Sequence, residues 1–269
     1  MIAKDLMYRF EQFASPQIAE KWDHVGLQLG NSFQPVTRVM TTLDVRPEVV
    51  KEAIEKHVDF IFAHHPMMFH AAENLDLSDP QNNMYAELIK HDIVVYGAHT
   101  NLDNVNGGMN DWLAHELNLT QTVPLLDGGI DPNSGELYGM GRVGILPKAM
   151  NTDDFAVYCK QVFNIKGLRL INGEPTKLIN RVAILGGSGG EFYKQAVAMN
   201  ADAYITGDVS YHVAHDMIAH NLVVVDPGHH IECVCVHQLH LLFDKWSTEN
   251  NWQIQITESK VNTEPFTFV

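Results

Sequence analysis

Several features that mark common classes of protein are scarce in this sequence. Its 269 residues include only three cysteines, and no apolar run approaches the roughly 20 residues of a membrane-spanning helix. The first residues, Met1 to Asp5, lack the apolar core of a secretory signal. A small, odd number of cysteines also argues against a framework of disulfides. We therefore expect a cytoplasmic protein with free thiols and no membrane partner.

Basic residues are scarce as well. The chain has 18 lysines and arginines against 33 aspartates and glutamates, a formal net charge of -15, and no basic cluster stands out. Attraction to phosphate needs a basic patch, so nucleic acid is disfavoured as a partner, although a local basic pocket is not excluded. Hydrophobic residues make up 45% of the chain, which is enough for the core of one large or two medium domains.

Histidine, by contrast, is abundant, with 15 in the chain. Two of them, His64 and His65, directly follow the short apolar run of residues 60–63 and precede Pro66. In an open α/β sheet, residues that form a site lie just past the carboxyl end of a strand. Pro66 disfavours helical geometry at His65, so both imidazoles could reach one ion from an extended turn. The alternative is that they are two ordinary polar residues of a loop.

The same pattern occurs twice more. The apolar residues 93–98 lead into His99 and Asp103, and residues 222–226 are followed by His229, His230 and Glu232. Three predicted strands thus deliver nitrogen and carboxylate ligands to their carboxyl ends. With no cysteine near the first two strands, such ligands suit Zn, Mn, Fe or a similar divalent ion better than a thiolate-bound structural zinc.

The order of the predicted elements indicates an α/β fold. A strand over residues 36–43, a helix over 47–57 and the strand at 60–63 form a strand-helix-strand unit, typical of parallel crossovers. The polar, glycine-rich stretch 125–135 looks like a boundary, after which strands and helices begin anew. We predict two similar halves: lobe one over residues 1–125 and 226–269, and lobe two over residues 126–225.

Three other polar stretches have two interpretations each. The residues from Trp22 to Gly30 form a site wall or a tight turn. The glycine-rich loop 186–190 lies between a predicted strand and helix, where it would bind an anion or allow close packing. Asp208 and His212 come after a short predicted strand at 203–206. They are either residues near a metal site or polar groups that cap a helix.

Taken together, several segments resemble the Nif-three-like dinuclear metal-centre family, widely named GTP cyclohydrolase 1 type 2 homologues. The matching segments are Trp22-Asp23 with Gly26-Leu27, His64-His65-Pro66, His99 to Asp103, Gly139 to Gly144, Gly186 to Gly189, Thr206 to Asp208, and Gly228-His229 with Glu232. They span nearly the whole chain in the family's order. Some relatives carry an extra domain between the halves, for which 269 residues leave no room.

The resemblance implies two intertwined α/β lobes, two divalent ions per chain in a cleft between them, and a toroidal homohexamer. Carried over by motif, the metal ligands are His64, His65, Asp103, His229 and Glu232, with His230 as the alternative to His229. As support from an outer shell of residues we consider His99, Asp208 and His212. Trp112, Trp246 and Trp252 could contact another copy or pack in the core, and the sequence does not decide which.

The expected chemistry is hydrolysis. Five ligands for two ions leave open coordination positions, and paired ions suit attack by water on phosphorus, an amide or a ring carbon. The ligands do not select the bond, and the cysteine-and-histidine zinc arrangement of a GTP ring-opening enzyme is not apparent. We predict a metal-dependent hydrolase that acts on a nucleotide-like or other small polar substrate. The alternative is a non-catalytic metal-binding adaptor or metal-handling protein.

Overall fold

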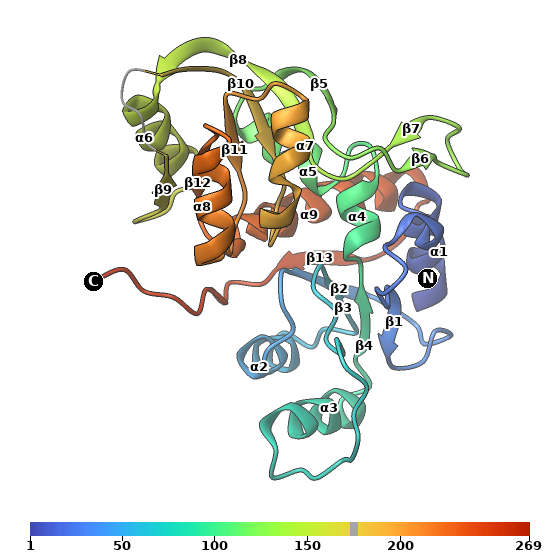
Figure 1. The fold of residues 1–269 in the computed structure, drawn as a ribbon. Coiled ribbons are helices and arrows are strands. Elements are labelled where there is room, and N and C mark those ends of the chain that lie inside the picture. Colours follow the sequence, from blue (N-terminus) through green and yellow to red (C-terminus); the bar gives the residue numbers. More distant parts are fainter. Residues whose placement is uncertain (173–176) are drawn as a thin grey trace. The chain divides into compact units, whose positions relative to one another are not determined.

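The computed structural model describes residues 1–172 and 177–269, which fold into two compact units (Figure 1). Unit 1 consists of Met1–Leu102 and Cys233–Thr263, and unit 2 of Asp103–Glu232 and Glu264–Val269. These bounds differ from those of the predicted lobes. The glycine-rich stretch that suggested a boundary instead lies inside unit 2, where β6 (Gly129–Ile130) pairs with β7 (Leu137–Tyr138). The chain leaves unit 1 within helix α4 (Thr100–Asn104).

The other elements of unit 1 come from both ends of the chain. They are α1 (Ala3–Phe13), η1 (Pro16–Ile18), β1 (Gly26–Leu29), β2 (Arg38–Thr42), α2 (Pro47–Glu55), β3 (Phe60–Ala63), α3 (Pro80–Lys90), β4 (Val94–Gly97), α9 (Val234–Glu249) and β13 (Gln255–Glu258).

Unit 2 contains the remaining elements of the described chain. They are α5 (Met109–Glu116), β5 (Thr120–Pro124), β8 (Arg142–Asn151), α6 (Thr152–Val162), β9 (Arg169–Ile171), β10 (Leu178–Ile184), η2 (Gly190–Phe192), α7 (Tyr193–Ala198), β11 (Ala203–Ile205), α8 (Tyr211–Ala219), β12 (Val223–Asp226) and, at its end, η3 (His229–Cys233).

The sheet of unit 1 has the strand order β1-β4-β3-β2-β13. Its strands run parallel except for β1, which is antiparallel at one edge. Because side chains alternate along a strand, β3 packs on both of its faces. Ile61 and Ala63 join the core cluster that includes residues of α2 and α3. Phe62 contacts Phe10 of α1 and Phe243 of α9, each with 4.7 Å between ring centroids. Helices therefore cover both faces of this sheet.

The sheet of unit 2 has the strand order β5-β8-β10-β11-β12-β9. Strands β10, β11 and β12 run parallel, and the other pairs are antiparallel. Ala183, Tyr204 and Val224 pack in one cluster with residues of α7 and α8, the helices drawn in orange beside these strands in Figure 1. Val182 and Ile184, which point to the opposite face, are also fully buried, and α5 and α6 contact the sheet as well.

Residues 26–29 form a strand where the sequence suggested a site wall or a tight turn. Gly26 and Gly30, at the two ends of this region, have φ angles of +108° and +101°, so they supply the unusual backbone angles expected of them. At Gly30 an added Cβ would lie 2.8 Å from the Cα of Val94, which explains why a residue with a side chain would not fit there. Strand β1 thus passes close to β4 at the edge of the sheet.

Trp246, for which the sequence left two interpretations, lies in the core of unit 1 and is only 2% exposed. Its ring packs against those of Phe13 and Phe243, at centroid distances of 5.9 and 5.6 Å. Trp112 and Trp252 are both partly buried. In the part of the chain that the structure describes, no helix is long and apolar enough to cross a membrane.

Candidate metal centre

Unit 1 brings three histidines together where β3 and β4 end. Ala63 and Gly97 are partners in the parallel ladder, so His64, His65 and His99 follow neighbouring strand ends. His64 is fully buried, and its ring centroid lies 4.9 Å from that of His65 and 5.3 Å from that of His99. The potential ligand atoms of the three residues all lie within 4.8 Å of one another. This three-histidine group could hold a metal ion.

Each of these rings has an oxygen atom beside its Nδ1 nitrogen. The partners are the carbonyl of Ala98 at 2.8 Å for His64, Oδ1 of Asp44 at 2.7 Å for His65, and Oδ2 of Asp23 at 3.1 Å for His99. A carbonyl oxygen can only accept, so Nδ1 of His64 carries the proton and its Nε2 carries the lone pair in the neutral ring. The carboxylates favour the same tautomer at the other two rings, and Nε2 is then the nitrogen that would bind an ion.

Asp44 is a functional candidate that the sequence analysis did not identify. It lies just past the carboxyl end of β2, which runs parallel to β3, so the strand-end pattern that selected His64 applies to it too. Besides its contact with His65, Asp44 accepts a hydrogen bond from the hydroxyl of Thr263, near the carboxyl end of the chain. Asp44 is thus well placed to orient the imidazole of His65.

Asp23 has the same relation to His99. Burial by itself would raise the pKa of Asp23, but the neighbouring imidazole of His99 and the hydrogen bonds from Thr100 outweigh it and lower the pKa to about 2. Both the backbone N–H and the hydroxyl of Thr100 donate to Asp23, at 2.9 and 2.6 Å. Asp23 is therefore a carboxylate at neutral pH and lies beside His99, whose supporting role stays a prediction.

Unit 2 contains the other predicted ligands. Asp103 in α4 and Glu232 in η3 are both buried, and their potential ligand oxygens lie within 4.8 Å of each other. Nε2 of His229 lies 3.1 Å from Oε2 of Glu232, three residues later. Strand β12, which leads to these residues, belongs to the sheet of unit 2, whereas β3 and β4 belong to that of unit 1. Each unit thus contains candidate ligands of its own, histidines in unit 1 and a histidine with two carboxylates in unit 2.

Asp208 supports His229 in the way that Asp44 supports His65. Its Oδ2 lies 2.7 Å from Nδ1 of His229 and accepts a hydrogen bond of 2.6 Å from the hydroxyl of Ser188. Burial alone would raise the pKa of Asp208, but the hydrogen bonds from Ser188 and His229 lower it. Asp208 has a φ of +54°, a backbone conformation that aspartate tolerates better than most residues. Ser188, like Asp44, was not singled out from the sequence.

The remaining two candidates, His212 and His230, lie outside the potential ligand groups of the described residues. His212 is exposed on α8, with its ring 5.4 Å from that of Tyr211, and it belongs to none of the potential ligand groups among residues 1–172 and 177–269. His230 is half-buried in η3 and is likewise outside these groups within the described chain. His229 therefore has the better geometry of the two adjacent histidines, and a role for His212 stays a prediction.

The glycine-rich loop 186–190 lies directly against these ligands. Gly187 has a φ of +64°, and an added Cβ would lie 2.8 Å from Oε1 of Glu232 and 3.2 Å from Nε2 of His229. The loop leads into η2 and then α7, which has only six residues. Close approach to Glu232 and His229, rather than an anion at a helix terminus, accounts for the glycine at position 187.

A Gly187→Ala substitution is expected to weaken metal binding by roughly 10-fold or more, because the new methyl group would displace the Glu232 carboxylate and the His229 ring. Gly135→Ala is the matched control: its φ of +74° imposes a similar backbone strain, but nothing lies within 4 Å of the added Cβ. Competition with a chromophoric chelator measures both affinities. Equal losses in the two variants would show that strain, not displacement of the ligands, is responsible.

Asp44→Ala is expected to lower metal affinity roughly 10- to 100-fold, the usual effect of losing a carboxylate that orients a ligating histidine. Thr263→Val is the control, because it removes the other hydrogen bond to Asp44 and leaves the contact with His65. Metal titration of both variants, with thermal melts to check folding, separates the two roles. If Thr263→Val weakened metal binding as much as Asp44→Ala, orientation of His65 would not be the cause.

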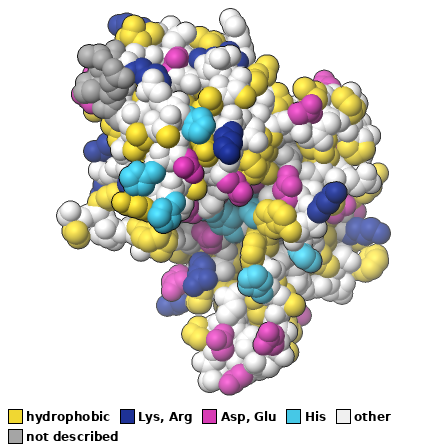
Figure 2. All heavy atoms as spheres, in the orientation of Figure 1, with side chains coloured by type: hydrophobic (Ala, Val, Ile, Leu, Met, Phe, Trp, Pro, Cys, Tyr) yellow, Lys and Arg dark blue, Asp and Glu magenta, His cyan; other side chains and the backbone are white. Residues whose placement is uncertain are grey.

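Some histidine and acidic side chains, the kinds that could bind a metal ion, reach the surface. On the face drawn in Figure 2, histidine and acidic side chains are both visible, and the side chains of His229 and Asp208 are 37% and 43% exposed.

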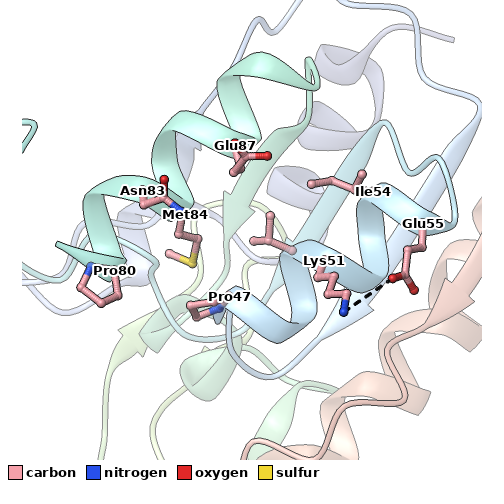
Figure 3. A pocket seen from close by; sticks show the side chains of 9 residues that line it. Pro47, Lys51, Ile54, Glu55, Pro80, Asn83, Met84 and Glu87 are labelled. Atoms are coloured by element: carbon pink, nitrogen blue, oxygen red, sulfur yellow. Dashed lines mark ion pairs between the residues drawn. The ribbon is translucent and has the colours of Figure 1, made fainter. Parts of the chain in front are cut away.

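A pocket of about 310 Å³ lies between α2 and α3 (Figure 3). It is lined by Pro47, Val50, Lys51, Ile54, Glu55, Pro80, Asn83, Met84 and Glu87. This lining includes none of the candidate ligands described above.

Comparison with known proteins matches residues 1–265 to the model of a family described as Duf34/NIF3 (NGG1p interacting factor 3). The GTP cyclohydrolase 1 type 2 homolog of Streptococcus pneumoniae serotype 4 is 41% identical over 270 residues, which cover 99% of either chain. The Bacillus subtilis protein of the same name is 29% identical over 367 residues, covering 99% of this chain and 98% of its own.

Solved structures are similar over the whole length. A Bacillus cereus protein related to NIF3 has a TM-score of 0.95 at 27% identity, and a Staphylococcus aureus hypothetical protein has 0.93 at 32%. Both comparisons cover 100% of this chain and 99% of the other. The mixed α/β fold and the resemblance found in the sequence are thereby confirmed.

Proposed function

Because this chain belongs to the Duf34/NIF3 family, we propose that it binds two divalent metal ions and hydrolyses a nucleotide-like or other small polar substrate. The proposed ligands are His64, His65, Asp103, His229 and Glu232. One observation carries the proposal: at His64, His65 and His229, Nδ1 lies 2.7 or 2.8 Å from an oxygen atom. Histidines that ligate metals are held in this way, with Nε2 turned to the ion.

The donor set agrees with this proposal. Imidazole nitrogens and carboxylate oxygens suit Zn, Mn or Fe. Bound there, paired ions would supply an acidified water and positive charge to stabilise a developing anion. The protein's own residues would hold the geometry: Asp44 and Asp208 orient the rings of His65 and His229, and the close approach of Gly187 confines the Glu232 carboxylate.

Anaerobic metal analysis combined with an activity screen on nucleotides, phosphoesters and amides tests the proposal. We expect about two ions per chain after loading and metal-dependent turnover of at least one substrate class. Less than about half an ion per chain would overturn the proposed centre. Two bound ions without turnover on any substrate would overturn the proposed hydrolase and leave the binding site intact.

A metal-handling or adaptor role is the second candidate, favoured by the exposure of His229 and Asp208. An ion bound at partly exposed ligands can exchange with a partner or chelator. In that case we expect rapid transfer of metal to a competing chelator and no turnover. An enzyme, by contrast, should retain its ions during many catalytic cycles, so rates of metal exchange measured beside the activity screen separate the two functions.

We further propose, on the basis of the family resemblance, that the chain assembles into a homohexamer. Such an assembly would admit small molecules to the ions. The mass of one chain is 30.2 kDa. Light scattering at low protein concentration tests the assembly, and a clean monomer with full metal occupancy would refute it. The cytoplasmic location expected from the sequence is part of the same proposal and is tested by fractionation of cells that produce the protein.

A further inference from the structure

Two large aromatic side chains are exposed beside the three-histidine group of unit 1. Trp22 is 54% exposed and Phe69 is 57% exposed, and their ring centroids lie 5.9 Å apart. The ring of Trp22 also meets the ring of His99 edge to face at 5.8 Å. His99 in turn contacts both His64 and His65. A continuous series of rings thus leads from the proposed metal ligands to an exposed aromatic surface.

The backbone around Trp22 is held on both sides by one residue. The hydroxyl of Thr100 accepts a hydrogen bond from the backbone N–H of Glu20. The backbone N–H and the hydroxyl of Thr100 both donate to the carboxylate of Asp23. Nδ1 of His24 also lies 3.1 Å from the carbonyl oxygen of Trp22. Trp22 is therefore exposed on a fixed stretch of backbone. A ligand would not have to order this stretch on binding, which favours affinity.

The segment that carries Phe69 is anchored just before it. The carbonyl of Met67 accepts hydrogen bonds from Gln81 and Tyr85 of α3, at 3.0 and 3.3 Å, and the N–H of Met68 donates to Gln28 of β1. Because both aromatic residues follow anchored backbone, the pair is part of a built surface.

We propose that Trp22 and Phe69 form a stacking surface for the planar heterocyclic ring of the substrate. The proposal deepens the proposed function and rests on it, because the reacting group of that substrate would lie at the ions held by His64 and His65. Indole and phenyl faces stack well on aromatic heterocycles, and such stacking does not need hydrogen bonds to the ring. A nucleotide, with a flat base and a polar group that can approach the metal ligands, fits this chemistry.

Calorimetric titration of the metal-loaded full chain with guanosine 5′-monophosphate and with ribose 5-phosphate tests the proposal. The two probes carry the same phosphate and sugar, but only the first has a ring to stack. We expect the nucleotide to bind roughly 5- to 100-fold more tightly than ribose 5-phosphate, the range that stacking of one base provides. Chromatography of the recovered nucleotide confirms that it stays intact during the titration.

Three variants assign the difference to Trp22. Trp22→Ala should bind both probes with similar affinity, while Trp22→Phe should retain most of the preference for the nucleotide. Phe33→Ala is the control, since Phe33 is 66% exposed in the same unit and contacts Lys4 instead of the histidines. It should behave as the wild type.

Four results would overturn the proposal. The wild type could fail to prefer the nucleotide, or Trp22→Ala could keep the preference. Trp22→Ala could also lose metal, which would show that Trp22 acts through the ligands. Self-association that disappears in Trp22→Ala would likewise overturn it, by assigning the surface to a second copy of the chain. Failure of the proposed function looks different: the wild type would bind no metal during loading, before any probe is added, or would bind two ions and turn over no substrate in the separate activity screen.

Discussion

The Asp103→Ala variant is expected to lose at least one of the two proposed metal ions and its catalytic turnover while keeping its fold. Asp103 is 8% exposed, and a ligand oxygen of its carboxylate lies within 4.8 Å of one from Glu232. Removal of a ligand should weaken metal binding more than loss of a residue that only orients one, so we expect a decrease of more than roughly 100-fold. Elemental analysis after gel filtration, together with the rate on the best substrate of the screen, measures both effects.

Asp216→Ala is the control for this experiment, because Asp216 is an exposed residue of α8 outside the potential ligand groups of the described chain. It should retain wild-type metal content and turnover. Circular dichroism of both variants verifies that the fold is intact. An Asp103→Ala protein with two ions per chain and an unchanged rate would remove Asp103 from the centre.

Trp246→Ala should lower the free energy of unfolding by about 3–5 kcal/mol, the usual effect of replacing a buried large aromatic residue by alanine. The Trp246 ring is 2% exposed, packs against the rings of Phe13 and Phe243, and has the guanidinium of Arg9 over its face at 4.3 Å. The substitution would therefore leave a cavity in the core of unit 1 and remove a cation–π contact. Urea denaturation followed by circular dichroism measures the loss.

Trp252→Ala makes a useful comparison, because Trp252 lies just after α9 and is only partly buried. We expect it to lose about 1 kcal/mol, the typical value for a single substitution. If both variants lost the same amount, the difference in burial between the two tryptophans would not determine their contributions.

Much of the fold could be predicted because its helices and central strands follow simple periodicities. The spacing of Leu6, Met7 and Phe10 predicts a helix over residues 3–13, and α1 spans these residues with all three side chains buried. The apolar run at 60–63 is β3, buried at every position. The sequence also predicts a helix over residues 152–162 with Thr152 as its cap. Helix α6 has these bounds, but the capping side chain is that of Asn151, which accepts a hydrogen bond from the N–H of Asp154.

The elements that were missed lack an apolar pattern. Strand β5 (Thr120–Pro124) is exposed along most of its length, so no alternation of apolar and polar residues marks it. Strand β1 is only four residues long and is bordered by glycines that suggested a turn. The division into units was misplaced for a related reason: a loop rich in glycine looked like a linker, whereas the chain leaves unit 1 within a helix.

For the site, the strand-end rule found the ligand candidates and one of their partners, Asp208, but not Asp44, and it did not indicate which carboxylate contacts which ring. His64 and His99 directly follow strands, so their positions could be inferred from local sequence. The residues that fix the rings come from distant parts of the chain: Asp44 is 21 residues from His65, and Asp208 is 21 residues from His229. Such contacts depend on how the strands are paired. No local spacing of residues indicates them before the sheet order is known.

The strand order of unit 1 has a consequence for how the protein is made. Strand β13 pairs with β2, and α9 packs against the same sheet. More than half of the chain lies between these two elements and the other strands of the sheet. A nascent chain therefore cannot complete this sheet until nearly all residues have left the ribosome. The segment Asp103–Glu232 is continuous and contains the whole sheet of unit 2 within the described chain. Translation thus favours folding of unit 2 first, while the sheet of unit 1 waits with the edge of β2 unpaired and without α9 on the face that α1 also covers.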